Sequence, residues 1–157
     1  MLYEVKTSNW GKDIEIFDHN NKSVLKAYYK KRYWYSSFYY LSSEINGNQL
    51  EIKYGNFWLT KYVIKNNDEA IGEITNINGN PKILFKGKKY LIRHNGLLKG
   101  RYLLLNQNNE TLISVRVQHK IFKSIFFLDR NTDTFNEDIP YLLLITYYIV
   151  RKKYGHH

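Results

Sequence analysis

The residues best suited to chemistry form a basic segment in the middle of the chain. Residues 81–102, PKILFKGKKYLIRHNGLLKGRY, contain seven Lys and Arg and no Asp or Glu. Arg binds phosphate through paired hydrogen bonds, and Lys acts as a point charge. We therefore predict a surface over residues 82–101 that holds a phosphate or an anionic membrane, through Lys86, Lys88, Lys89, Arg93, Lys99 and Arg101. The alternative is a solvated basic face that only keeps the protein soluble.

The positive charge of the whole chain is concentrated around this segment. The formal net charge is +10. Residues 74–128 hold ten Lys and Arg against Glu110 alone, a net of +9. Residues 1–73 hold ten basic against nine acidic residues, and residues 129–157 hold four against four. Such asymmetry favours an anionic partner, either nucleic acid or an acidic lipid surface.

A second candidate segment interleaves basic and aromatic residues. Residues 26–40, KAYYKKRYWYSSFYY, contain four Lys and Arg and eight aromatic residues. Cationic grooves with aromatic platforms bind single-stranded nucleic acids, so the alternative function is nucleic-acid binding that uses Tyr33, Trp34 and Tyr35. The same pattern also fits two strands whose alternate aromatic side chains fill a core. A scaffold for another protein is a third alternative.

Other kinds of site have little support in the sequence. The chain has no cysteine, which excludes disulfides, thiol catalysis and thiolate-bound metals. The zinc-protease motif HExxH and the glycine-rich nucleotide-binding motifs are missing, and His19, His94 and His119 have no second ligand at metal spacing. A Ser–His–Asp site would have to be assembled in space. We therefore expect a non-enzymatic protein without a cofactor or a metal.

The elements that must position these residues are predicted to be short strands. Apolar stretches rich in Tyr, Ile and Val alternate with turn signals such as DHNNKS, Asn46-Gly47 and NGNP. About eleven or twelve such strands at regular spacing are typical of an all-β sandwich or barrel. Since the chain has 157 residues and no linker or repeat, we predict one domain over residues 1–157.

The last predicted element is a helix that is apolar on every side. Acidic residues and Pro140 suit its start, and Arg151 to Lys153 suit its end. The twelve residues from Ile139 to Val150 reach only about 18 Å, too short to span about 30 Å of hydrocarbon. We therefore predict no transmembrane span, but a closed antiparallel barrel of about twelve strands around a buried helix at about 138–154. A helix packed in one α+β layer is the alternative.

These features resemble the tubby C-terminal-like superfamily, which includes tubby domains, phospholipid scramblases, plant LURP-one-related proteins and small bacterial relatives. The resemblance lies in the many short strands, the segment DTFNEDI (residues 133–139), the final helix YLLLITYYIV and the opening hairpin YEVKTSNWGKDIEIFDHNNKSVLKA. It covers nearly the whole chain and is closest in kind to the small bacterial members. It implies a twelve-stranded barrel around a hydrophobic helix and no shared enzymatic activity. Tubby domains bind phosphoinositide headgroups through basic residues on the barrel surface. With the basic segment, the resemblance therefore leads us to expect a non-enzymatic domain that binds an anionic lipid or a phosphorylated headgroup through residues 82–101.

In scramblases a calcium segment precedes the final helix. Here Asp129, Asn131 and Asp133 have a D-x-N-x-D spacing, which is how a calcium loop begins. The sixth position is Thr134 and not Gly, and the twelfth is Pro140 and not Glu, so the pattern is broken. We expect a turn that leads into the helix.

The N-terminal sequence, MLYEVKTSNW, has neither the basic region nor the long apolar region of a signal peptide. The lack of cysteine also fits a reducing compartment. We expect a cytoplasmic protein, either free or peripheral to a membrane. We assign no role to His156 and His157.

Overall fold

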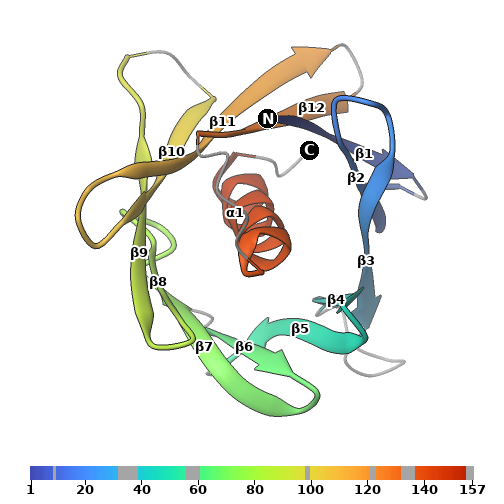
Figure 1. The fold of residues 1–157 in the computed structure, drawn as a ribbon, viewed down its shortest axis with the longest axis vertical. Helices are drawn as coiled ribbons and strands as arrows, with labels where there is room; N and C mark the ends of the chain where they lie inside the picture. Colours follow the sequence, from blue (N-terminus) through green and yellow to red (C-terminus); the bar gives the residue numbers. More distant parts are fainter. Residues whose placement is uncertain are drawn as a thin grey trace.

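The structure is a computed structural model that describes residues 1–8, 10–31, 39–55, 61–97, 100–120, 123–131 and 137–154. Within them, twelve strands are followed by one helix (Figure 1). The elements are β1 Leu2–Ser8, β2 Asp13–Phe17, β3 Ser23–Lys31, β4 Tyr39–Ile45, β5 Asn48–Tyr54, β6 Lys61–Asn66, β7 Glu69–Thr75, β8 Lys82–Phe85, β9 Lys88–His94, β10 Arg101–Asn106, β11 Thr111–Lys120, β12 Lys123–Arg130 and α1 Ile139–Tyr154.

The strands form a closed antiparallel barrel (Figure 1). Each strand pairs with the next one in the chain, and β1 pairs with β12 to close the ring, with Tyr3 opposite Leu128 and Val5 opposite Phe126. Because each strand has a partner on both sides, the sheet has no open edge. The structure therefore confirms the predicted barrel and excludes the alternative of a single α+β layer.

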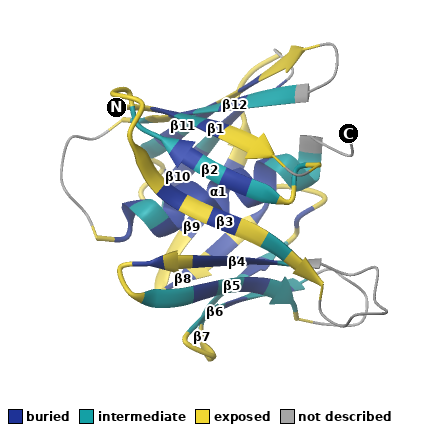
Figure 2. Cartoon of the chain, turned by 90° about the vertical axis from the view of Figure 1, so that its right-hand side faces the viewer, coloured by how far each residue is buried: buried dark blue, intermediate teal, exposed yellow. Residues whose placement is uncertain are grey.

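Alternation along the strands sorts the side chains between the lumen and the solvent. In β2 the buried residues are Ile14 and Ile16, and in β8 they are Ile83 and Phe85. The residues between them are more exposed, since successive side chains of a strand point to opposite faces. Figure 2 shows the same alternation of buried and exposed positions along β3. The lumen is thus lined with apolar side chains.

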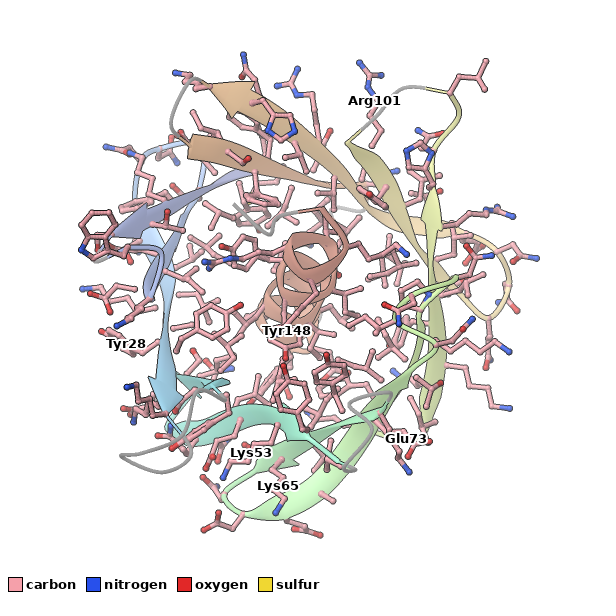
Figure 3. The ribbon with its side chains drawn as sticks, turned by 180° about the vertical axis from the view of Figure 1, so that it is seen from behind. Tyr28, Lys53, Lys65, Glu73, Arg101 and Tyr148 are labelled. Carbon is pink, nitrogen blue, oxygen red and sulfur yellow. The ribbon has the colours of Figure 1, made fainter. Side chains whose placement is uncertain are left out.

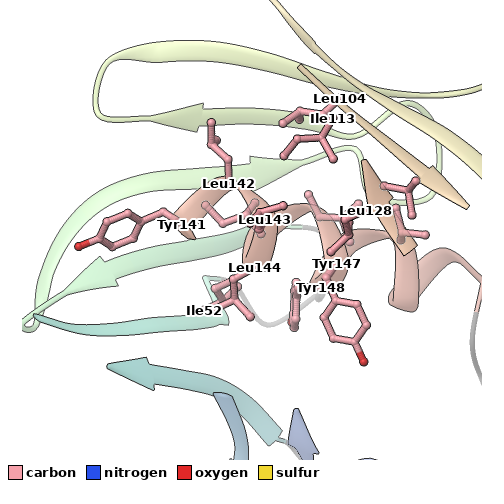
Figure 4. Close-up of a cluster of buried hydrophobic side chains, with 14 of the residues drawn as sticks. Ile52, Leu104, Ile113, Leu128, Tyr141, Leu142, Leu143, Leu144, Tyr147 and Tyr148 are labelled. Atoms are coloured by element: carbon pink, nitrogen blue, oxygen red, sulfur yellow. The ribbon is translucent and has the colours of Figure 1, made fainter. Parts of the chain in front are cut away.

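Helix α1 occupies this lumen (Figure 1). Every residue from Tyr141 to Val150 is buried, which no amphipathic surface helix would show. Figure 4 shows Leu142 pointing toward Leu104 and Ile113 of one wall. Leu144 points toward Ile52 of another wall (Figure 4). The observed span, Ile139–Tyr154, confirms the predicted buried helix at about 138–154.

Within the described part of the chain, the structure contains no helix that is both long and apolar enough to cross a membrane.

The direction of α1 distinguishes the two ends of the barrel. At the end where the helix begins, which we call the entry end, Lys86 contacts Asp138 and the Tyr141 hydroxyl donates to the Ile45 carbonyl. At the end where the helix finishes, which we call the exit end, Arg151 contacts Gly11. Turns 18–22, 46–47, 67–68, 86–87 and 107–110 lie at the entry end, and the described parts of connections 9–12, 76–81 and 95–100 lie at the exit end.

If the wall encloses α1, the variant Leu143→Ala should lower the free energy of unfolding by about 2–5 kcal/mol, because a buried leucine leaves a cavity. Leu143 is 2% exposed. The control is Leu97→Ala, at a solvent-exposed position, which should change the same quantity by less than about 0.5 kcal/mol. Urea denaturation followed by circular dichroism measures both. Equal effects of the two variants would contradict an enclosed helix.

Candidate functional site

Three arginines project from neighbouring strands of the outer wall. Arg101 of β10 lies directly opposite Arg116 of β11, and Arg93 of β9 lies opposite Leu103 of β10. All three are exposed, and Figure 3 shows Arg101 directed away from the barrel. Directly opposite side chains of a sheet start about 5 Å apart, and diagonal ones about 7–8 Å apart. We call Arg93, Arg101 and Arg116 the arginine face, because their guanidinium groups are within reach of one ligand.

A hollow of about 320 Å³ borders the arginine face. Arg101 and Arg116 line it, together with Leu2, Asn95, Tyr102, Ser114, Val115, Phe127 and Asp129. The guanidinium carbon of Arg116 lies 4.9 Å from the centroid of the Phe127 ring, and this cation–π contact supports the side chain. Asp129 brings a negative charge to the rim, and its Oδ1 lies 3.4 Å from the N-terminal amine. The hollow therefore combines two guanidinium groups and neutral polar groups with one carboxylate, which is paired with the N-terminal amine.

The arginine face has an excess of positive charge. None of the ion pairs found among the described residues includes Arg93, Arg101 or Arg116. Like charges directly opposite each other destabilise a sheet. An anion between Arg101 and Arg116 would remove this repulsion and accept paired, charge-assisted hydrogen bonds. The arrangement is therefore suited to a phosphate or a carboxylate.

The predicted basic set divides into two groups along β9. Arg93 and Arg101 lie toward the exit end, whereas Lys88 and Lys89 begin β9 at the entry end. Arg93 lies four positions after Lys89, which is about 13 Å along a strand. Lys89 borders a different hollow of about 510 Å³, together with Lys82, Glu73 and Leu84. Lys99 lies outside the described residues.

Lys86 connects the barrel to the start of the helix. Its Nζ lies 2.8 Å from Asp138 Oδ1 and 4.8 Å from the centroid of the Tyr141 ring. Asp138 directly precedes α1, so this ion pair ties the turn between β8 and β9 to the first turn of the helix. Since its charge is already compensated, Lys86 is less suited than Arg93 or Arg101 to bind an external anion.

The basic residues at the end of α1 hold the helix to the exit end. Arg151 Nη1 donates to the Gly11 carbonyl at 2.9 Å. Lys152 Nζ donates to the Tyr54 hydroxyl at 3.1 Å, and Lys153 Nζ donates to the Gly79 carbonyl at 2.6 Å. The three partners belong to different parts of the barrel, so the helix end is fixed on several sides.

Tyrosine rings surround Lys152 inside the exit end. Its Nζ lies 5.3, 5.9 and 5.6 Å from the ring centroids of Tyr54, Tyr62 and Tyr148. Burial raises the pKa of Tyr62 and of Tyr148 far above the ordinary tyrosine value. Burial also raises the pKa of Tyr29, against the opposing effect of Arg151. These hydroxyl groups therefore stay protonated at neutral pH, and the cluster supports the helix end through packing.

Among the described residues, the structure gives no support to a calcium segment before the helix, and it does not describe the residues predicted to stack on nucleic acid. Asp129 faces the N-terminal amine, the Ser114 hydroxyl donates to Asn131 Oδ1 at 3.4 Å, and Asp133 lies outside the described residues. In the described ranges, no group of three or more His, Asp or Glu is placed to hold a metal ion. The stacking residues proposed for nucleic acid, Tyr33, Trp34 and Tyr35, also lie outside the described residues.

One polar pair that the sequence did not indicate lies between β11 and β12. Ser124 Oγ is 3.0 Å from His119 Nδ1 at an exposed position. The strand register places the two residues directly opposite each other, so the pairing of the strands is sufficient to explain the contact.

Comparison with known proteins finds no matching family model, no matching curated protein and no matching solved structure.

Raising the pH above about 10 should destabilise the protein. A tyrosine of the unfolded chain ionises near pH 10, whereas burial raises the pKa of Tyr148 in the folded state. Above this pH the unfolded chain binds fewer protons than the folded chain. The free energy of unfolding therefore falls, by up to about 1.4 kcal/mol per pH unit for each such tyrosine.

The variant Tyr148→Phe should reduce this slope, and Tyr28→Phe, at an exposed position, should not. Urea denaturation at a series of pH values between about 9 and 11 measures the slope. Identical slopes for the wild type and Tyr148→Phe would show that burial of this hydroxyl does not control the alkaline transition.

Proposed function

We propose that the protein is a non-enzymatic binding domain that holds a phosphate-bearing anion, such as a phosphorylated headgroup, on the arginine face. The observation that carries the proposal is the placement of Arg101 directly opposite Arg116, with Arg93 on the adjacent strand. Two guanidinium groups side by side can each offer paired donors to phosphate oxygens. Lysine ammonium groups would offer the charge without this geometry.

The surroundings of the arginine face support binding more than catalysis. The hollow has a volume of about 320 Å³, at the low end of the range for small-molecule sites. Asn95 and Ser114 add neutral hydrogen-bonding groups at its border. Catalytic sites commonly exclude water around the reacting groups, whereas Arg93, Arg101 and Arg116 are solvent-exposed. A charged headgroup can bind there without losing its whole hydration shell.

We also propose that the chain is a member of the tubby-like superfamily. The support is the sequence pattern together with a twelve-stranded barrel around an apolar C-terminal helix. Headgroup binding on the outer wall would be consistent with that membership. A cytoplasmic location, at most peripheral to a membrane, belongs to the same proposal.

The test is titration of the protein with inositol trisphosphate, followed by calorimetry. The double variant Arg101→Gln/Arg116→Gln should bind at least about tenfold more weakly than the wild type, because it loses the paired charged donors. The matched control is Lys26→Gln/Lys65→Gln, which removes the same charge from strands β3 and β6. Control binding should stay within about twofold of the wild type.

A thermal melt without ligand adds a second readout. The Arg101→Gln/Arg116→Gln variant should melt at the same temperature as the wild type or higher, since it loses a repulsive pair. Equal weakening of binding by both double variants would reduce the proposal to a general charge effect. Tighter binding of a single-stranded oligonucleotide than of inositol trisphosphate would favour nucleic acid as the ligand.

A further inference from the structure

We infer that the exit end of the barrel docks onto an anionic lipid bilayer, with Trp10 and Leu97 inserted at the interface between water and lipid. The inference rests on the proposed function, because the arginine face then contacts headgroups of the same surface. The inference adds two points to the proposed function: the phosphate belongs to a membrane lipid, and the exit end of the barrel faces the membrane.

Trp10 and Leu97 are the most exposed large apolar side chains among the described residues. Trp10 is 98% exposed and Leu97 is 102% exposed, whereas the other exposed apolar side chains reach at most 48%. Trp10 precedes β2 and Leu97 lies between β9 and β10, so both belong to connections of the exit end. Tryptophan is enriched where membranes meet water, because its ring is apolar and its N–H is polar.

The backbone at Trp10 is held in a conformation that bulky residues rarely adopt. Its φ is 58°, and that of Gly11 is 79°. The Gly11 N–H donates to the Ser8 carbonyl at 3.0 Å, and Arg151 binds the Gly11 carbonyl at 2.9 Å. The positive φ of Gly11 favours glycine there, since other residues rarely adopt it. The side chain of Trp10 is solvent-exposed, so packing within the protein does not explain its strained backbone. We infer that the side chain contacts a binding partner.

The charge on the two ends of the barrel differs in sign. The described connections of the exit end, residues 10–12, 76–81 and 95–97, contain no Asp or Glu, and the helix ends there with Arg151, Lys152 and Lys153. The described connections of the entry end carry five carboxylates, Asp18, Asp68, Glu110, Glu137 and Asp138, against two lysines, Lys22 and Lys86. Only the exit end therefore complements an anionic surface.

The two apolar residues are placed to orient the barrel. Figure 1 shows β1 and β2 on a different side of the barrel from β9 and β10, so Trp10 and Leu97 occupy separate parts of the rim. Leu97 lies between Arg93 and Arg101 in the sequence, and the Asn95 N–H closes this loop by donating to the Arg101 carbonyl at 2.8 Å. A bilayer that receives Leu97 would therefore bring its headgroups to the arginine face.

A bilayer fits these observations better than a protein partner. A protein interface has a contiguous apolar centre that excludes water, whereas the described part of this basic rim carries two separate exposed apolar residues, Trp10 and Leu97. Separate apolar anchors with a surrounding positive charge are what a fluid, anionic surface accommodates.

The test is flotation with vesicles of phosphatidylcholine containing phosphatidylserine. The double variant Trp10→Ser/Leu97→Ser should bind these vesicles about tenfold more weakly than the wild type, because interfacial binding scales with buried apolar area. The control, Val24→Ser, removes an apolar side chain that is 43% exposed at the entry end and should bind as the wild type does. Vesicles of phosphatidylcholine alone should retain little protein.

Fluorescence identifies which end contacts the lipid. The chain has three tryptophans, so the emission is measured in the variant Trp34→Phe/Trp58→Phe, in which Trp10 alone remains. Anionic vesicles should shift this emission to the blue. No shift, or unchanged flotation of Trp10→Ser/Leu97→Ser, would overturn the docking.

Soluble inositol trisphosphate separates this inference from the proposed function. Trp10→Ser/Leu97→Ser should bind it as the wild type does, since the arginine face is intact. If the wild type fails to bind inositol trisphosphate while vesicle binding still needs Trp10 and Leu97, the arginine face is wrong and the docking stands. If inositol trisphosphate binds at the arginine face but anionic vesicles do not float the wild type, the ligand is a soluble phosphate and the docking is wrong.

Discussion

The structure depends on the contact between α1 and the inner wall of the barrel. A helix that is apolar on all sides is stable in water only if protein covers its whole circumference. The closed ring of strands provides this cover, and its inward residues have no other core to join. Helix and barrel therefore stabilise each other, and neither is expected to persist alone.

Charged residues complete this arrangement at the two ends of the helix. At the entry end, Lys86 pairs with Asp138, and at the exit end Arg151 to Lys153 bind the rim. Cations near the last turn also suit the negative end of the helix dipole. The ion pair with Asp138 compensates the charge of Lys86, which would otherwise count toward an anion-binding surface, whereas the exit-end contacts are to neutral groups. Net charge alone therefore overstates how much of the basic sequence is open to a ligand.

Because α1 fills the lumen, we expect a ligand to bind on the outer wall or at the rims of the barrel. Most barrels that bind ligands inside leave the interior open, whereas α1 occupies this one. The arginine face and the exit end are consequently the surfaces with features that packing does not explain: opposed like charges on β10 and β11, and bare apolar residues in turns. Both lie near the loop between β9 and β10, which links the proposed headgroup site to the proposed lipid anchors.

The sequence by itself determined the strands, the helix and the enclosure of the helix by the strands. Strands and turns can be predicted because hydrophobic periodicity and turn residues are local features of the sequence. The enclosed helix can be predicted because residues 139–150 are apolar on every side and too short to span a membrane. The sequence also indicated Arg93 and Arg101, which are close in the chain. Only the tertiary structure decided that Arg116 lies beside them, that Lys86 forms an ion pair with Asp138, and that Trp10 and Leu97 lie at the same end of the barrel. Those relations depend on strand register and on the direction of α1, which bring together residues distant in the sequence.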